Sequence, residues 1–154
     1  MTQEDKELLF KELSKRLPYG VIIKTPDNNA HLIGLVKRLG FIKGKDYIDV
    51  ITDKNTYPIE HIKPYFRPIS SMTEEEVDKL FQILKINEDS DSGKEWLKVN
   101  DVGIIRLFTE VGKDFYEIDE AFDYLYSIHI DYCWICEKNL AIEVTEENNP
   151  YENC

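Results

Sequence analysis

The chain has 154 residues, of which 42% are hydrophobic and 32% are charged, a composition that is typical of globular proteins and excludes disordered and fibrous classes. Its 19 basic and 30 acidic residues give a formal net charge of −11, which argues against general adhesion to nucleic acid or anionic membranes. The sequence has no apolar run of about 20 residues, the length that a membrane helix needs. Its charged start lacks the pattern of a signal peptide, and its three cysteines, an odd number, fit a reducing compartment. We therefore expect a cytoplasmic protein without a membrane helix.

The first predicted element is a helix close to the start of the sequence. Thr2 is a typical N-cap residue, with Asp5 three positions later, and leucines then recur at helical spacing as far as Leu17. Pro18 and Gly20 follow directly, and both residue types end helices. The pattern therefore predicts one helix that begins after Thr2 and ends near Leu17.

Apolar and β-branched stretches then predict a small antiparallel sheet. Residues 21–23 and 32–36 flank a turn rich in Pro, Asp and Asn, which indicates a β-hairpin. Residues 32–39 also fit a helix that ends at Gly40, an alternative that periodicity alone leaves open, although we favour the strand. Residues 46–52 alternate between two faces and predict a third strand.

The next segment, residues 57–68, holds three prolines in the sequence YPIEHIKPYFRP. A proline has no N–H to donate to a sheet ladder, which is why it is rare in central strands. We expect this segment to form a short strand and one tight turn that closes the sheet, and not a central strand.

Two helices are predicted in the second half of the chain. Thr73 and Glu76 have the spacing of a capping box, with Met72 and Val77 placed as a hydrophobic staple, and the helix should run to about Leu84. Residues 96–109 resemble two short strands that turn at Asn100 and Asp101.

A second helix is predicted after Asp114, which forms a capping-box pair with Glu117. Apolar residues of this helix recur at steps of three and four and form one stripe. The members of the stripe are Phe115, Ile118, Phe122, Leu125 and His129.

The organisation expected from these elements is one compact domain over residues 1–154. Its parts are a helix and sheet (residues 1–70), an acidic helical part (73–147) and a short tail (148–154). Residues 1–72 carry 12 basic and 9 acidic side chains, a net charge of +3, whereas residues 73–154 carry 7 and 21, a net charge of −14. Such opposite charges fit a basic part docked on an acidic part, and equally fit the steering of a charged partner.

Three segments of the chain match a sequence pattern that we know: RLPYGV at residues 16–21, IKPYFRPISSMTEEE at residues 62–76, and AFDYLYSIHIDYCWICEKNLAIEV at residues 121–144. They resemble a family of uncharacterised small proteins from gut anaerobic bacteria and their phages. The resemblance covers the first 76 residues and the last quarter of the chain. It implies a small SH3-like curled sheet followed by helices, and a phage or mobile-element gene, but no activity.

The fold class that we predict is therefore α+β. It consists of an N-terminal helix, a small SH3-like curled antiparallel sheet, and a helical C-terminal half with a few short strands.

The candidate metal ligands are His129, Cys133 and Cys136. On a continuous helix these three side chains would share one face, and Cys154 could be the fourth ligand of a zinc site. Structural zinc sites usually draw paired ligands from two knuckles, so we expect packing cysteines and no metal. The pair Cys133 and Cys136 also lacks the following helix that a redox motif needs. Residues 87–93 deviate from a calcium loop in their glycine position. We expect no cofactor.

No pattern in the sequence indicates catalysis. His31 and His61 have no serine or cysteine nucleophile suggested nearby. The carboxylates that follow Asp114 face away from the apolar stripe, as a solvated helix surface does. We therefore expect a protein that is not an enzyme.

Two charged surfaces remain as candidate binding sites. Basic residues interleave with Tyr19, Tyr47, Tyr57, Tyr65 and Phe66, as in small barrels that hold single strands; the candidate nucleic-acid contacts are Lys24, Lys37, Arg38, Lys43, Lys63 and Arg67. The acidic helix offers a candidate protein-binding surface that consists of Glu117, Asp119, Glu120 and Asp123. The leading hypothesis is a non-enzymatic protein–protein interaction module, encoded by a phage or mobile element. The alternatives are a nucleic-acid-binding module and a small zinc or thiol protein that uses Cys133 and Cys136.

Overall fold

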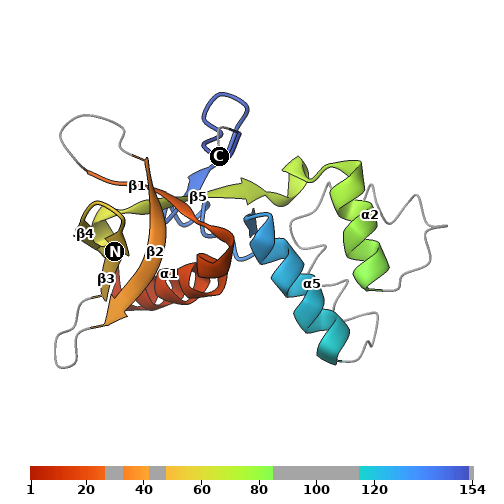
Figure 1. Cartoon of the computed structure of the whole chain (residues 1–154), viewed down its shortest axis with the longest axis horizontal. Coiled ribbons are helices and arrows are strands. Elements are labelled where there is room, and N and C mark those ends of the chain that lie inside the picture. The colour runs from red at the N-terminus through yellow and green to blue at the C-terminus, as the bar shows by residue number, and fades with distance from the viewer. Residues whose placement is uncertain (27–32, 42–47, 85–114, 153–154) are drawn as a thin grey trace. The chain divides into compact units, whose positions relative to one another are not determined.

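The computed structural model describes residues 1–26, 33–41, 48–84 and 115–152. Figure 1 shows a protein of the α+β class, with an N-terminal helix, short antiparallel strands and further helices among the described residues. The predicted class is confirmed. The strands predicted at residues 96–109 and the loop at residues 87–93, which was rejected as a calcium site, lie outside the described residues.

The chain divides into two compact units. Unit 1 contains residues 1–66 and 133–154, and unit 2 contains residues 67–132. The sequence predicts a boundary between two parts near residue 70, and the boundary between the units lies after Phe66. The C-terminal segment belongs to unit 1, so unit 2 is inserted between two parts of unit 1. The charges divide differently as a result: unit 1 has 12 basic and 14 acidic residues, and unit 2 has 7 and 16. Both units are therefore negative, with net charges of −2 and −9.

Helix α1 (Gln3–Arg16) begins with a complete capping box. The backbone N–H of Asp5 donates to Thr2 Oγ1 at 3.1 Å, and the N–H of Thr2 donates to Asp5 Oδ2 at 3.0 Å. A 3-10 turn (Leu17–Tyr19) follows, and Gly20 ends it with a φ of 76°, a conformation that suits glycine. The predicted helix and its end are confirmed.

The sheet of unit 1 is built from β1 (Ile22–Lys24), β2 (Ile33–Phe41), β3 (Ile48–Thr52), β4 (Thr56–Pro58) and the first part of β5 (Lys63–Pro68). Its order is β4-β3-β2-β1-β5, with antiparallel neighbours throughout. The fifth strand returns to the first, and a 3-10 turn (Ile59–His61) precedes it. The predicted hairpin and third strand are confirmed.

Strand β2 is the long strand about which this sheet curls. Its first part pairs with β1 and its second part with β3, and the register shifts between Val36 and Arg38. A shift of this kind is a β-bulge, which bends a strand and increases its twist. The helix that residues 32–39 could also form does not occur, because the described part of this segment, Ile33 onward, is a strand.

The proline-rich segment differs from its prediction. It forms two strands, β4 and β5, and β5 lies inside the sheet, with β1 on one side and β7 (Ile142–Glu143) on the other. The expectation that three prolines exclude a central strand was wrong. Each ladder of β5 spans two residue pairs, and the parallel ladder with β7 uses Tyr65 and Phe66, so the missing N–H of Pro64 removes no hydrogen bond from it.

The C-terminal segment completes unit 1. The backbone N–H of Val144 donates to the carbonyl of Phe66 at 2.8 Å. The Tyr151 hydroxyl donates to the carbonyl of Tyr65 at 2.8 Å and accepts from the N–H of Ile22 at 3.4 Å. Tyr151 therefore bridges β1 and β5. Residues 148–154 were predicted to be a tail, but the described part of this segment contacts the sheet through Tyr151.

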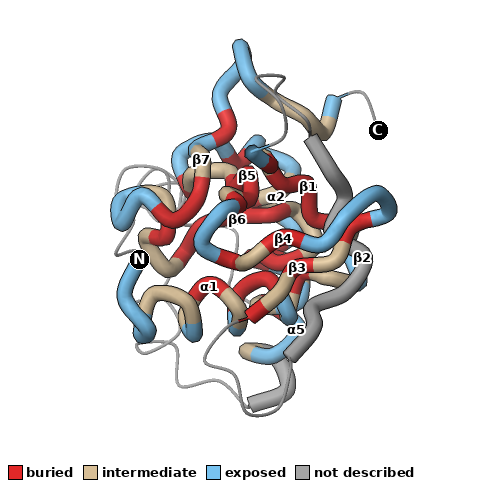
Figure 2. Tube along the Cα trace, turned by 90° about the vertical axis from the view of Figure 1, so that its left-hand side faces the viewer, coloured by how far each residue is buried: buried red, intermediate tan, exposed pale blue. Residues whose placement is uncertain are grey.

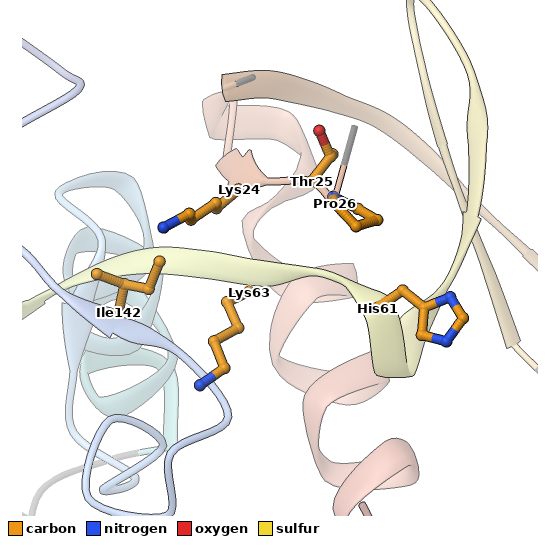
Figure 3. Close-up of a pocket in the computed structure, with 6 residues that line it drawn as sticks. All are labelled: Lys24, Thr25, Pro26, His61, Lys63 and Ile142. Atoms are coloured by element: carbon orange, nitrogen blue, oxygen red, sulfur yellow. The ribbon is translucent and has the colours of Figure 1, made fainter. Parts of the chain in front are cut away.

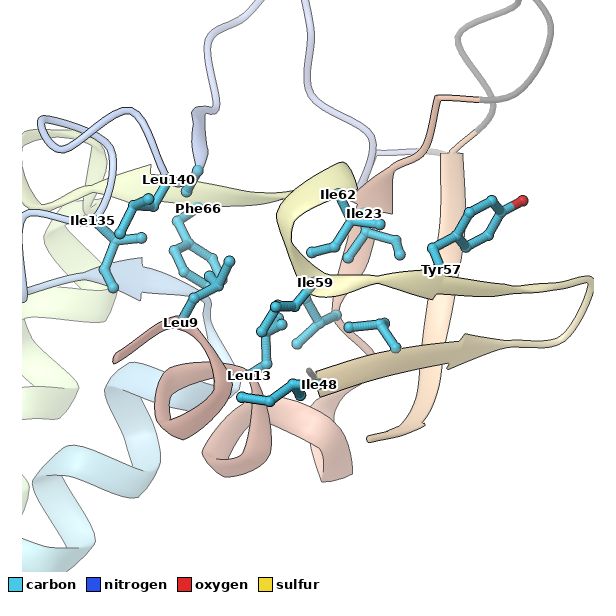
Figure 4. Close-up of a cluster of buried hydrophobic side chains, with 13 residues drawn as sticks. Leu9, Leu13, Ile23, Ile48, Tyr57, Ile59, Ile62, Phe66, Ile135 and Leu140 are labelled. Atoms are coloured by element: carbon cyan, nitrogen blue, oxygen red, sulfur yellow. The ribbon is translucent and has the colours of Figure 1, made fainter. Parts of the chain in front are cut away.

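The main core of unit 1 lies between α1 and the curled sheet. Figure 4 shows Leu9 and Leu13 of α1 and Ile135 and Leu140 of the C-terminal segment in the same cluster as Phe66 of β5. Figure 2 shows buried residues along β1 and β5, with exposed residues in the turns. The remaining members of the core are Val21, Ile23, Ile48, Val50, Tyr57, Ile59, Ile62 and Ala141.

Unit 2 contains the helices α2 (Glu74–Ile83) and α5 (Phe115–Ser127), which pack against each other. The predicted capping box of α2 is confirmed, since Glu76 N–H donates to Thr73 Oγ1 at 3.2 Å and Thr73 N–H to Glu76 Oε2 at 2.9 Å. The capping pair proposed for α5 begins at Asp114, which lies outside the described residues. Strand β6 (Ile130–Asp131) follows α5 and pairs in parallel with Arg67 and Pro68, the end of β5.

Candidate interaction surfaces

The acidic surface of α5 consists of Asp119, Glu120 and Asp123, all exposed. On other sides of the helix Ala121 and Leu125 are buried. The side chain of Glu117, the fourth predicted member, lies outside the described part of the chain. Among the described residues, the ion pairs join Lys6 to Glu60, Lys15 and Arg16 to Glu12, and Arg67 to Glu76, and none of them includes the acidic surface.

The side of α5 that meets α2 carries Tyr124, which is partly buried. The Lys79 ammonium lies 4.8 Å from the centre of the Tyr124 ring, a cation–π contact between the two helices. Burial, followed by the Glu76 carboxylate, raises the pKa of Tyr124, and Arg67 opposes this. The phenol therefore stays protonated at neutral pH.

Arg67, a predicted nucleic-acid contact, is engaged within unit 2. Its two terminal nitrogens donate to the Glu76 carboxylate at 2.7 and 2.9 Å, and one of them also donates to the Ser71 carbonyl at 2.9 Å. Burial tends to raise the pKa of Glu76, but hydrogen bonds from Arg67 and Thr73 outweigh it and lower the pKa. The structure thus makes Arg67 a partner of the α2 capping box.

The structure brings together two of the other basic residues that were predicted to contact nucleic acid. Lys24 and Lys63 are direct cross-strand partners on β1 and β5. The side chains of Lys37 and Arg38, and all of Lys43, lie outside the described part of the chain.

The aromatic residues expected between these lysines do not form a surface platform. Tyr57, Tyr65 and Phe66 are all buried in the cores of unit 1, so their faces are not accessible for stacking on bases. Tyr19 is exposed, and Tyr47 lies outside the described residues. Sequence periodicity does not separate core aromatics from surface aromatics in a strand that has neighbours on both sides.

A pocket of about 480 Å³ opens beside Lys24 and Lys63. Figure 3 shows its lining from three parts of unit 1: Lys24 ends β1 and is followed by Thr25 and Pro26, His61 precedes β5 and Lys63 begins it, and Ile142 belongs to β7. Of these residues, only Lys24 and Lys63 were predicted to belong together; the return of β5 to β1 and of β7 to β5 brings the others beside them. His61 was considered alone, and Ile142 not at all.

The proposed zinc ligands do not share a helix face. Helix α5 ends at Ser127, and His129 has a φ of 59°, in the left-handed region. The chain then enters β6, so the assumption of a continuous helix to Cys136 was wrong. Cys133 and Cys136 are half-buried and pack against the core of unit 1, and the described residues contain no group of three His, Cys, Asp or Glu side chains that could hold a metal.

Comparison of the chain with protein-family models, with curated proteins and with solved structures finds no match. In the described part of the chain, no helix combines the length and apolar character that crossing a membrane requires. Functional inference therefore depends on the residues themselves.

Proposed function

We propose that this protein is a non-enzymatic interaction module of the cytoplasm, which binds a basic protein partner through the acidic surface of α5. The observation that supports this most directly is the separation of faces on α5. Asp119, Glu120 and Asp123 are exposed and take part in none of the ion pairs of the described residues, while Leu125 is fully buried. The carboxylates thus have no packing role that would explain them.

The charge of unit 2 supports the same proposal. Its 7 basic residues leave most of its 16 acidic residues uncompensated. Clustered charge of one sign attracts a partner of the opposite sign and raises its association rate. Because the Debye length is about 8 Å at physiological salt, this attraction acts mainly near contact and weakens as salt is added. The resemblance to small phage-associated proteins makes a host or phage protein the expected partner.

The decisive experiment reverses charge on the acidic surface. Partners recovered by pull-down from host lysate are tested for association rate with the wild type and with the Glu120→Lys, Asp123→Lys double variant. We expect the variant to associate at least about tenfold more slowly at low salt, with a nearly unchanged melting temperature because both side chains are exposed.

A matched control is the double variant Glu146→Lys, Glu147→Lys, which reverses two exposed acidic residues of unit 1. It changes the net charge of the protein by the same amount and should leave the association rate close to that of the wild type. Equal slowing by both double variants would show that net charge alone is responsible, and unaltered association of the α5 variant would contradict the proposal.

The alternative of a nucleic-acid-binding module is supported by the cross-strand position of Lys24 and Lys63. It is opposed by the net negative charge of both units and by the burial of Tyr57, Tyr65 and Phe66. We expect weak or no binding of single-stranded or duplex DNA at physiological salt, measured by fluorescence anisotropy. Tight, salt-sensitive binding that is lost in the Lys37→Glu, Arg38→Glu variant would make nucleic-acid binding the leading function.

A further inference from the structure

The pocket beside β1 and β5 has a lining that favours an anion. Lys24 and Lys63 are Cα partners on two antiparallel strands, and like charges at paired positions destabilise a sheet. Lys24 forms no ion pair among the described residues, and Lys63 donates to Asn139 Oδ1, a neutral acceptor. Neither ammonium is therefore compensated by a described carboxylate.

We propose that this pocket binds a small molecule that carries a phosphate group, held by Lys24 and Lys63. This site lies in unit 1 and is independent of the acidic surface of α5. Charge decides between phosphate and carboxylate: a phosphate monoester carries about −1.5 to −2 at neutral pH, which matches two lysines, whereas one carboxylate compensates a single lysine.

The Lys24 and Lys63 side chains share an anion when the Lys63 ammonium turns from Asn139 towards the Lys24 side of β5. Cβ atoms of directly opposed residues lie about 5 Å apart in antiparallel pairs, and the flexible stem of lysine lets its ammonium choose among positions. In Figure 3 the Lys24 side chain extends towards Ile142, while that of Lys63 turns to the other side of β5. The Lys63 ammonium has further N–H donors beyond the one that Asn139 accepts.

The rest of the lining fits a ligand larger than phosphate itself. A volume of about 480 Å³ is in the range of small-molecule pockets and exceeds the needs of a single anion. Pro26 and Ile142 provide apolar surface, and the ring of His61 can donate or accept a hydrogen bond. The neighbouring carboxylate of Glu60 is bound by Lys6 at 3.1 Å, so it adds little repulsion.

The test is a titration of the full chain, followed by amide and side-chain NMR shifts. The probes are inorganic phosphate and pyrophosphate, with acetate at the same ionic strength as the control for charge alone. We expect saturable shifts at the pocket residues with both phosphate probes, and tighter binding of pyrophosphate. Acetate should cause weaker shifts that do not saturate.

Three variants make the assignment specific. Lys24→Gln and Lys63→Gln should each weaken pyrophosphate binding at least about tenfold, because each removes a charged donor. Lys54→Gln changes an exposed lysine in the turn between β3 and β4 and should bind like the wild type. Lys24→Arg retains the charge and should retain binding, and an unchanged melting temperature of Lys24→Gln excludes misfolding as the cause of its loss.

Shifts that do not saturate, or equal weakening in the Lys54→Gln variant, would overturn the proposal, since both would indicate general screening of surface lysines. A thymidine oligonucleotide that bound more tightly in proportion to its length would also overturn it, because the site would then be part of a polymer-binding surface.

Discussion

The two units each contain an arginine–glutamate pair, and the surroundings of the two pairs differ. In unit 1, Arg16 is fully buried, lies 2.5 Å from Glu12 Oε2, and stacks with its guanidinium 4.5 Å from the centre of the Phe66 ring. In unit 2, Arg67 binds Glu76 at 2.7 Å, with about a fifth of each side chain exposed. The same kind of ion pair thus lies in the core of one unit and near the surface of the other.

The difference in burial gives the two ion pairs different expected energetic roles. Two charges without water attract strongly, but each has also lost its hydration, so the pair as a whole contributes little while the removal of one partner leaves a costly isolated charge. At the surface, water and salt screen the attraction. Arg67 and Glu76 therefore serve mainly to fix the start of α2, where Glu76 also completes the capping box.

The largest effect is expected from Glu12→Gln. This variant leaves the Arg16 charge buried without its carboxylate, and the free energy of unfolding should fall by about 3–5 kcal/mol, as measured by urea denaturation. The double variant Glu12→Met, Arg16→Met removes both charges and should lose much less. If the single and double variants were equally destabilised, lost packing and not an isolated charge would be the cause.

A similar or smaller loss is expected from Leu125→Ala in unit 2. Leu125 is fully buried, and its truncation should reduce the free energy of unfolding by about 2–5 kcal/mol through the cavity that it leaves. The neighbouring variant Asp123→Ala changes an exposed residue of the same helix and should melt like the wild type. Equal melting of the two variants would show that α5 is not held by its apolar side.

Glu76→Gln should have a smaller effect, because its pair with Arg67 is partly exposed. Loss of the charged cap and of the ion pair together should cost about 1 kcal/mol, measured by thermal unfolding. The control is Glu75→Gln, an exposed residue in the same turn of α2. A loss for Glu76→Gln as large as that for Glu12→Gln would remove the distinction between the two pairs.

The smallest difference concerns the pH dependence of stability. Burial opposes ionisation of Glu12, but Arg16 and Lys15 outweigh it, so the pKa of Glu12, like that of Glu76, lies below the ordinary value of 4.5. A carboxylate whose pKa is lower in the folded state than in the unfolded state stabilises the fold at pH values above the unfolded-state pKa. This stabilisation is lost as the pH falls through the folded-state pKa. Chemical denaturation at several pH values should show stability falling below about pH 4.5. The slope should be slightly flatter in Glu76→Gln and unchanged in Glu75→Gln.

Local features of the fold were predictable from the sequence. The capping boxes at Thr2 and Thr73 depend on residues three positions apart, and the β-branched run before Lys24 and the alternating run before Thr52 specify strands through their own side chains. Features that depend on distant pairing were not predictable. The position of Pro64 inside the sheet depends on where β7 pairs, and the end of α5 depends on the left-handed conformation of His129.

The candidate sites follow the same rule. The exposed carboxylates of α5 lie on one helix, so periodicity alone placed them opposite the apolar stripe. The pocket of Lys24, His61 and Lys63 is assembled by strands that are far apart in the sequence. A charge pattern can suggest that lysines belong together, but it cannot show which of them face one another or that Ile142 joins them.

The insertion of unit 2 between the two parts of unit 1 sets an order for folding during synthesis. Unit 2 is continuous in sequence, whereas unit 1 needs residues 133–152, which the ribosome makes after all of unit 2. Until then, β5 lacks its neighbour β7 and the bridge from Tyr151. An uncovered strand edge can pair with another chain, so β5 is open to such pairing during synthesis until residues 142–151, which follow unit 2 in the sequence, close it.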